Sequence, residues 1–152
     1  MPNEASLRIG AGVAIPSGML NASTGVNVSG IATVPLFESS VSVRIQGSYS
    51  RFGSGSSTGN PAYFEGSLGL EHDYERRGRT ISYSTAGLGY YHGSGSVEAA
   101  LPFGGKRRSH AGVSAGGGVK FPIGAINAFA DVRYVWISGS EEMIPLIVGV
   151  SF

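Results

Sequence analysis

The amino-acid sequence predicts an all-β protein: an eight-stranded antiparallel up-and-down transmembrane β-barrel that forms a single domain over residues 1–152. Three observations predict this fold. Apolar residues alternate with small or polar residues through most of the chain, which is the period of a β-strand with one apolar face. The eight expected strands are joined by connections that alternate in length. Residues 143–152 form a last apolar strand whose edges need partners, and closure of a barrel supplies them.

The alternation is clear in the first four expected strands. Leu7, Ile9 and Val13 share one parity in the first strand, at 6–15. Pro16 ends this strand because proline has no backbone N–H to donate to a ladder. The second, third and fourth strands have apolar residues on one parity and mostly serine, glycine or charged residues on the other. They span 26–34, 41–50 and 63–71.

The second half of the chain continues the pattern with one irregularity. The fifth expected strand spans 81–90. Its first apolar residues, Ile81 and Tyr83, have the opposite parity to Leu88, so we expect a β-bulge within it. The remaining strands alternate without interruption. They span 111–121, 127–136 and 143–152.

The connections fall into two groups. Short turns are expected at 35–40, 73–79 and 122–125. They alternate with four connections that are mostly longer, at 17–25, 53–60, 92–109 and 138–142. An even number of strands, with short turns at one end and longer loops at the other, is typical of outer-membrane barrels.

The composition indicates a folded chain with few charges. Charged residues are 14% of the sequence, well below the roughly 25% of soluble domains. Glycine is abundant, at 25 residues, but the 41% hydrophobic and 10% aromatic content argues against disorder. A net charge of +1 favours neither nucleic acid nor a strongly acidic partner.

The sequence also excludes several kinds of site and segment. It has no cysteine, so disulfides and thiolate metal ligands are impossible. Histidine, aspartate and glutamate are not clustered at metal-ligand spacing, and we expect no metal and no cofactor. No run approaches the roughly 18 apolar residues of a transmembrane helix. The first four residues do not resemble a secretion signal, which an outer-membrane protein needs, so we expect that the signal has been removed.

The charged residues predict which face of the sheet lies inside. Seven of them lie well within expected strands, and all seven have the non-apolar parity. Four are basic and three are acidic, so they can nearly neutralise one another in a shared lumen, a balance that charges facing water would not need. The interior of an eight-stranded barrel is narrow, so we expect a plug of salt bridges, with an ion or proton path as the alternative. The expected lumen charge network is Arg8, Arg44, Glu65, Glu71, Lys120, Asp131 and Arg133.

The aromatic residues on the apolar parity predict that this face meets lipid. They gather toward the two ends of the expected strands, with valine, leucine, alanine and glycine between them, as in the aromatic girdles of membrane barrels. One alternative is that these aromatic residues only cap strand ends. Another is a soluble ligand-binding barrel, in which the apolar face is the core. The expected girdle is Tyr49, Phe64, Tyr90, Tyr134 and Trp136 at the long-loop end and Tyr74, Phe121 and Phe152 at the short-turn end.

Four segments carry a resemblance to a known family. They are AGLGYYH (86–92), GGGVKFPIG (116–124), AFADVRY (128–134) and PLIVGVSF (145–152). With the overall pattern, they make nearly the whole chain resemble the small eight-stranded type of bacterial outer-membrane β-barrel. Phe152, preceded by Val150 and Val148, is similar to the family's C-terminal assembly signal, although Ile147 stands where the family often has glycine. The resemblance implies insertion into the outer membrane of a Gram-negative bacterium by the barrel-assembly machinery, through the C-terminal strand, with periplasmic termini. It implies no single activity.

The longest loop carries a candidate anion-binding site. Lys106, Arg107 and Arg108 are adjacent cations on the loop at 92–109, at the expected outer face. Three cations in a row can bind the phosphates of lipopolysaccharide or another polyanion. The alternative is an ordinary solvated loop.

The expected function is structural or interactive rather than enzymatic. We expect a monomer whose partners are membrane lipids, including lipopolysaccharide, with a polar lumen filled by side chains. A small low-conductance pore is one alternative. A lipid-modifying enzyme is another, but the three histidines, His72, His92 and His110, have no carboxylate certain to orient them.

Overall fold

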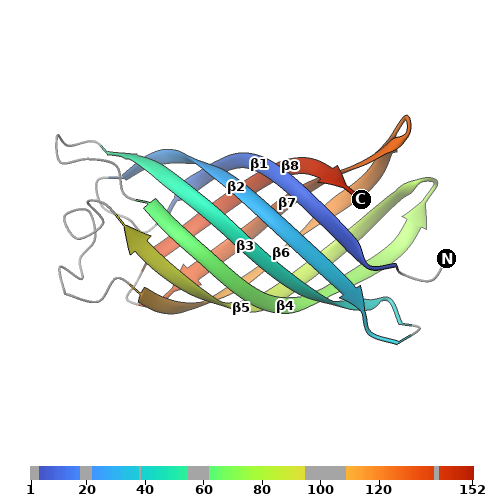
Figure 1. Cartoon of the computed structure of the whole chain (residues 1–152), viewed down its shortest axis with the longest axis horizontal. Helices are drawn as coiled ribbons and strands as arrows, with labels where there is room; N and C mark the ends of the chain where they lie inside the picture. The colour runs from blue at the N-terminus through green and yellow to red at the C-terminus, as the bar shows by residue number, and fades with distance from the viewer. Residues whose placement is uncertain (1–3, 18–21, 38, 55–61, 95–108, 139–140) are drawn as a thin grey trace.

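Eight antiparallel strands wind in chain order into a closed barrel, and β1 pairs with β8 to complete it (Figure 1). The structure is a computed structural model that describes residues 4–17, 22–37, 39–54, 62–94, 109–138 and 141–152. The strands are β1 (Ser6–Pro16), β2 (Ala22–Pro35), β3 (Val41–Ser54), β4 (Ala62–Arg77), β5 (Thr80–Ser94), β6 (Ser109–Ile123), β7 (Ile126–Ile137) and β8 (Glu141–Ser151). The predicted eight-stranded up-and-down barrel is confirmed.

The two ends of the barrel differ. The start of β1 and the end of β8 lie at the same end as the β2–β3, β4–β5 and β6–β7 turns, which we call the short-turn end (Figure 1). There the backbone N–H groups of Leu7 and Phe152 each donate to the other residue's carbonyl, at 3.1 and 2.8 Å. Gly78 and Gly124 begin two-residue turns with positive φ angles of 66° and 61°, which glycine adopts without steric cost. The opposite end is the long-loop end.

Several strands are longer than the sequence pattern predicted. β2 begins at Ala22, inside the expected loop, and β3 and β5 continue to Ser54 and Ser94. The expected turn at 73–79 is wrong in extent, because β4 continues to Arg77 and the chain turns at Gly78. Polar side chains near the strand ends obscured these extensions, whereas the ladder depends on backbone groups that every residue except proline supplies.

The β-bulge predicted in the fifth strand is also wrong. β5 pairs with β6 without a register shift, and Tyr83 points into the barrel, where it is 3% exposed. The irregularity lies on β4 instead, where the register shifts between Asp73 and Arg76. Tyr83 is therefore an interior aromatic residue, and its parity is regular.

The outer surface of the barrel is apolar. Leu88, Val148 and Leu68 are 68%, 60% and 59% exposed, and many other large apolar side chains on the same parity are exposed as well. Water-soluble monomers seldom expose so many large apolar side chains on one continuous face. Among the described residues, no helix is long and apolar enough to cross a membrane.

The interior is layered along the barrel axis. Its middle holds the charged side chains beside a small apolar group of Ile31, Phe129 and Ile147, and a second, larger apolar layer lies toward the long-loop end. We call that layer the apolar cluster. It consists of Ala14, Phe52, Tyr63, Tyr91, Val135, Ile137 and Met143, each at most 1% exposed. This layer differs from the interior of small and polar residues that the sequence predicts.

Glycines on the inner face make room for the large interior side chains. A Cβ atom at Gly118 would lie within 2.7 Å of the Tyr83 ring, and one at Gly112 would lie 2.8 Å from the Tyr91 ring. Both glycines belong to β6, so this strand contributes mainly space to the interior. Glycines at these positions therefore allow close packing inside the barrel.

Candidate functional site

Glu71 is the centre of an ion-pair network in the middle of the barrel. Arg8 donates to both of its carboxylate oxygens, and the bond from Nη1 to Oε2 is 3.0 Å long. Arg44 Nη1 donates to Oε2 at 3.1 Å, and Lys120 Nζ lies 2.8 Å from Oε1. Glu71 is 1% exposed, so its carboxylate has lost its contact with water. Three cations from three other strands compensate the free-energy cost of this desolvation.

The network extends to Asp131 on β7. Asp131 Oδ2 accepts hydrogen bonds from Arg44 Nη1 at 2.9 Å and from the Tyr83 hydroxyl at 2.8 Å. The Arg8 guanidinium also lies 5.1 Å from the Tyr83 ring centre and 5.9 Å from that of Phe129. These aromatic faces add cation–π attraction to a charge that has no contact with solvent.

A second carboxylate network lies closer to the long-loop end. Arg133 donates to both oxygens of Glu65, at 2.9 and 3.3 Å. Ser48 and Ser67 donate to the same carboxylate at 2.7 and 2.8 Å. Arg133 Nε lies 3.6 Å from Asp131, too far for a hydrogen bond, so the two networks are joined by charge attraction alone.

Asp73 completes the charge balance and was missed by the sequence analysis. Lys120 Nζ donates to both Asp73 oxygens, at 2.8 and 3.0 Å. With Asp73, the described interior holds four cationic side chains (Arg8, Arg44, Lys120 and Arg133) and four carboxylates (Glu65, Glu71, Asp73 and Asp131) in ion pairs. The signal was present, since Asp73 has the same parity as Glu71, but the residue was assigned to a turn.

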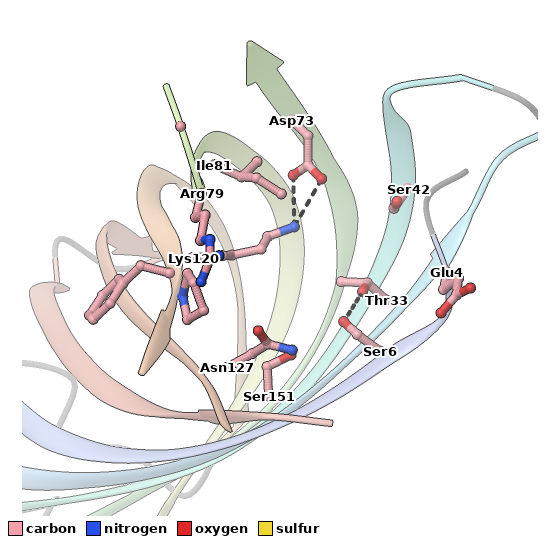
Figure 2. Close-up of a pocket in the computed structure, with 13 residues that line it drawn as sticks. Glu4, Ser6, Thr33, Ser42, Asp73, Arg79, Ile81, Lys120, Asn127 and Ser151 are labelled. Atoms are coloured by element: carbon pink, nitrogen blue, oxygen red, sulfur yellow. Dashed lines mark hydrogen bonds and ion pairs between the residues drawn. The ribbon is translucent and has the colours of Figure 1, made fainter. Parts of the chain in front are cut away.

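A cavity opens at the short-turn end (Figure 2). It has a volume of about 440 Å³ and we call it the vestibule. Figure 2 shows Lys120 reaching across it to Asp73, with the hydrogen-bonded Ser6 and Thr33 on another part of the wall. Lys120 and Asp73 are 20% and 15% exposed at their side chains, in contrast to the other interior charges, so the vestibule gives water access to this pair alone among the described ion pairs.

The structure places the predicted residues as follows. All seven charges expected in the lumen point inward, and the ion pairs above bring them together. All eight aromatic residues expected in the girdle have the outward parity, with Phe152 72% and Tyr90 60% exposed. The rings of Tyr49 and Phe64 pack at a tilt of 49°, with their centres 4.8 Å apart. Lys106, Arg107 and Arg108 lie outside the described residues.

The histidines do not assemble a catalytic set within the described part of the chain. His92 Nδ1 lies 2.8 Å from Ser109 Oγ on the outward face at the long-loop end, and no carboxylate is hydrogen-bonded to this described pair. His72 lies near the opposite end, beside Ser40. Within the described ranges, no group of three or more histidine, aspartate or glutamate side chains is arranged to hold a metal ion.

A closed eight-stranded barrel with an apolar exterior and an ion-paired interior has the fold of small bacterial outer-membrane β-barrels. Neisserial surface protein A is similar over 97% of this chain and 95% of its own, with a TM-score of 0.73 and 15% identity. The N-terminal β-barrel domain of Pseudomonas aeruginosa OprF is similar over 98% of both chains (TM-score 0.57, 17% identity). Ail, the attachment invasion locus protein of Yersinia pestis, is similar over 99% of this chain and 100% of its own (TM-score 0.56, 18% identity). No protein-family model and no curated protein sequence matches the chain.

Proposed function

We propose that this chain is an integral outer-membrane β-barrel of a Gram-negative bacterium, with an interior filled by side chains and a structural or surface-interaction role. The observation that carries the proposal is the inverted distribution of side chains. Eight charged groups are paired inside the barrel, while large aliphatic side chains such as Leu88 cover its exterior. A water-soluble barrel has the opposite arrangement, because burial of apolar surface is its main source of stability.

The height of the apolar exterior supports the same proposal. On β8, the outward positions from 144 to 152 carry only apolar residues. Nine residues at about 3.4 Å each, tilted by about 40°, span about 23 Å along the barrel axis. This height is close to the apolar band of about 25 Å on outer-membrane barrels.

We expect the barrel to fold only where detergent or lipid covers its exterior. Refolding into detergent micelles should give a β-sheet circular dichroism spectrum and a compact gel band that slows on boiling. In plain buffer the exposed aliphatic side chains should drive aggregation instead. A compact, monomeric β-protein in plain buffer would contradict the proposed location and favour a soluble ligand-binding barrel.

The interior contacts favour a plug over the two alternative functions. The described charges are neutralised in pairs, and the apolar cluster fills part of the described interior with buried aliphatic and aromatic side chains. We therefore propose a non-conducting barrel in preference to a small pore. We also propose that it is not an enzyme, since the His92–Ser109 pair has no orienting carboxylate among the described residues.

We further propose that the long-loop end contacts polyanions. Ail, a structural neighbour, was crystallised with the heparin analogue sucrose octasulfate. In this chain, Lys106, Arg107 and Arg108 supply adjacent cations that could bind sulfates or lipopolysaccharide phosphates. The support for this site is the sequence alone.

Replacing Lys106, Arg107 and Arg108 together by glutamine should weaken polyanion binding. The refolded variant should elute from a heparin column at lower salt than the unmodified chain, because fewer counterions are exchanged on binding. The matched control replaces Arg76, Arg77 and Arg79, which removes the same charge at the other end. An equal decrease in both variants would mean that net charge, and not the loop, controls retention.

The closed ladder supports the remaining parts of the proposal. β8 pairs with both β7 and β1, so the described strands leave no sheet edge open to another copy, consistent with a monomer. We propose that β8, which is followed directly by the exposed Phe152, is the strand that the barrel-assembly machinery recognises. The termini then lie in the periplasm, at the short-turn end.

A further inference from the structure

We infer that the barrel interior is a compartment open at one end: small hydrophilic solutes enter the vestibule from the short-turn end, and the apolar cluster, not the ion pairs, seals the other end. This inference rests on the proposed function, because a seal matters only between two compartments. In this arrangement the residues of the vestibule admit solutes, whereas the apolar cluster forms the permeability barrier.

The vestibule is built to hold water and small polar solutes. Its wall presents hydroxyl groups, the Asn127 amide and the charged pair of Lys120 and Asp73 (Figure 2). These groups offer both donors and acceptors, and opposite charges are available to a zwitterionic solute. The cavity volume of about 440 Å³ exceeds by far the roughly 30 Å³ that one water molecule occupies in the liquid.

The apolar cluster has the opposite character. Phe52, Ile137 and Met143 come from three different strands and meet inside the barrel, where each is at most 1% exposed. The Phe52 and Tyr63 rings meet edge to face, with centres 6.3 Å apart, which places aromatic surface inside this layer. A hydrated ion that enters this layer finds few groups to replace its water, so an apolar constriction is a barrier even without charge.

The ion pairs alone are a weaker seal than the apolar cluster. Lys120 already contacts two carboxylates, Glu71 and Asp73, so its ammonium can move between them without losing a charged partner. The charged groups of Lys120, Glu71 and Asp73 can also exchange their contacts with one another for contacts with an entering polar solute. The aliphatic side chains and the Phe52 ring of the cluster carry no polar group that could make an equivalent exchange.

Single cysteines can test this arrangement, because the chain contains none of its own. In lipid nanodiscs, where both barrel ends meet water, a charged methanethiosulfonate reagent should modify Asn127→Cys in the vestibule rapidly. It should modify Ser50→Cys, which is 1% exposed beside the cluster, slowly. Trimming the cluster with Phe52→Ala and Met143→Ala should accelerate the Ser50→Cys reaction on the order of tenfold or more. Neutralising Glu71 with Glu71→Gln should leave that rate much less changed.

Three controls make each outcome decisive. Ser17→Cys, exposed at the long-loop end, gives the unprotected rate, and heat-modifiable gel migration identifies folded protein. If the double variant does not fold, Met143→Ala alone provides the comparison. Slow modification of Asn127→Cys, fast modification of Ser50→Cys in the untrimmed barrel, or no acceleration on trimming would each overturn the inference. Fast modification of the lipid-facing Leu88→Cys would instead refute the proposed membrane location.

Discussion

Glu71→Gln should reduce the free energy of unfolding by about 3–5 kcal/mol, the usual cost of removing one partner from a buried ion pair. Glutamine keeps the size of the side chain but removes the charge that Arg8, Arg44 and Lys120 share. Three buried cations would then face one carboxylate fewer. The loss is measurable by urea unfolding in lipid vesicles, with fluorescence from Trp136, the single tryptophan of the chain.

A matched substitution and a rescue separate charge imbalance from other causes. Glu4→Gln removes the same charge from an exposed residue and should change stability by no more than about 0.5 kcal/mol. Adding Arg8→Met to Glu71→Gln restores equal numbers of described interior cations and carboxylates, so it should recover part of the loss. Stability like that of the unmodified chain in the Glu71→Gln variant would mean that the interior charges are solvated and do not depend on one another.

Leu88→Arg should destabilise the membrane-inserted barrel by about 2–4 kcal/mol, because it places a cation at the middle of the proposed lipid-facing band. Leu88 is 68% exposed and lies near the centre of β5. In a soluble protein, an arginine at so exposed a position would change stability by no more than about 0.5 kcal/mol. The same vesicle unfolding measurement therefore reports on the environment of the outer face.

The control for this prediction lies on the same strand and the same face. His92→Arg introduces the same side chain four residues nearer the long-loop end, where the bilayer ends, and should cost at most about 1 kcal/mol. A large difference between the two variants supports the membrane orientation. Equal and small effects would contradict the proposed outer-membrane location, even if the barrel itself is folded.

The sequence predicted local features of the chain well, and the errors arose where the polarity of a side chain was a poor guide to its position. Alternation defined the strands and the inward parity of residues such as Arg44 and Asp131, because successive side chains in any strand point to opposite faces. The errors arose at strand ends, where polarity was taken as a sign of a turn. Asp73 was lost from the interior in this way. Tyr83 was assigned to the apolar face, although it lies two residues from Thr85, which pairs with Glu71 in the β4–β5 ladder and points inward.

The sequence by itself determined the strand number, the two faces and seven of the eight described interior charges that neutralise one another. Only the tertiary structure decided which charges meet, since Arg8 and Glu71 are 63 residues apart and Arg44 and Asp131 are 87 residues apart. It also decided that Phe52, Ile137 and Met143 form one apolar layer. Parity is a property of each strand alone, whereas these contacts depend on the register, tilt and closure of all eight strands together.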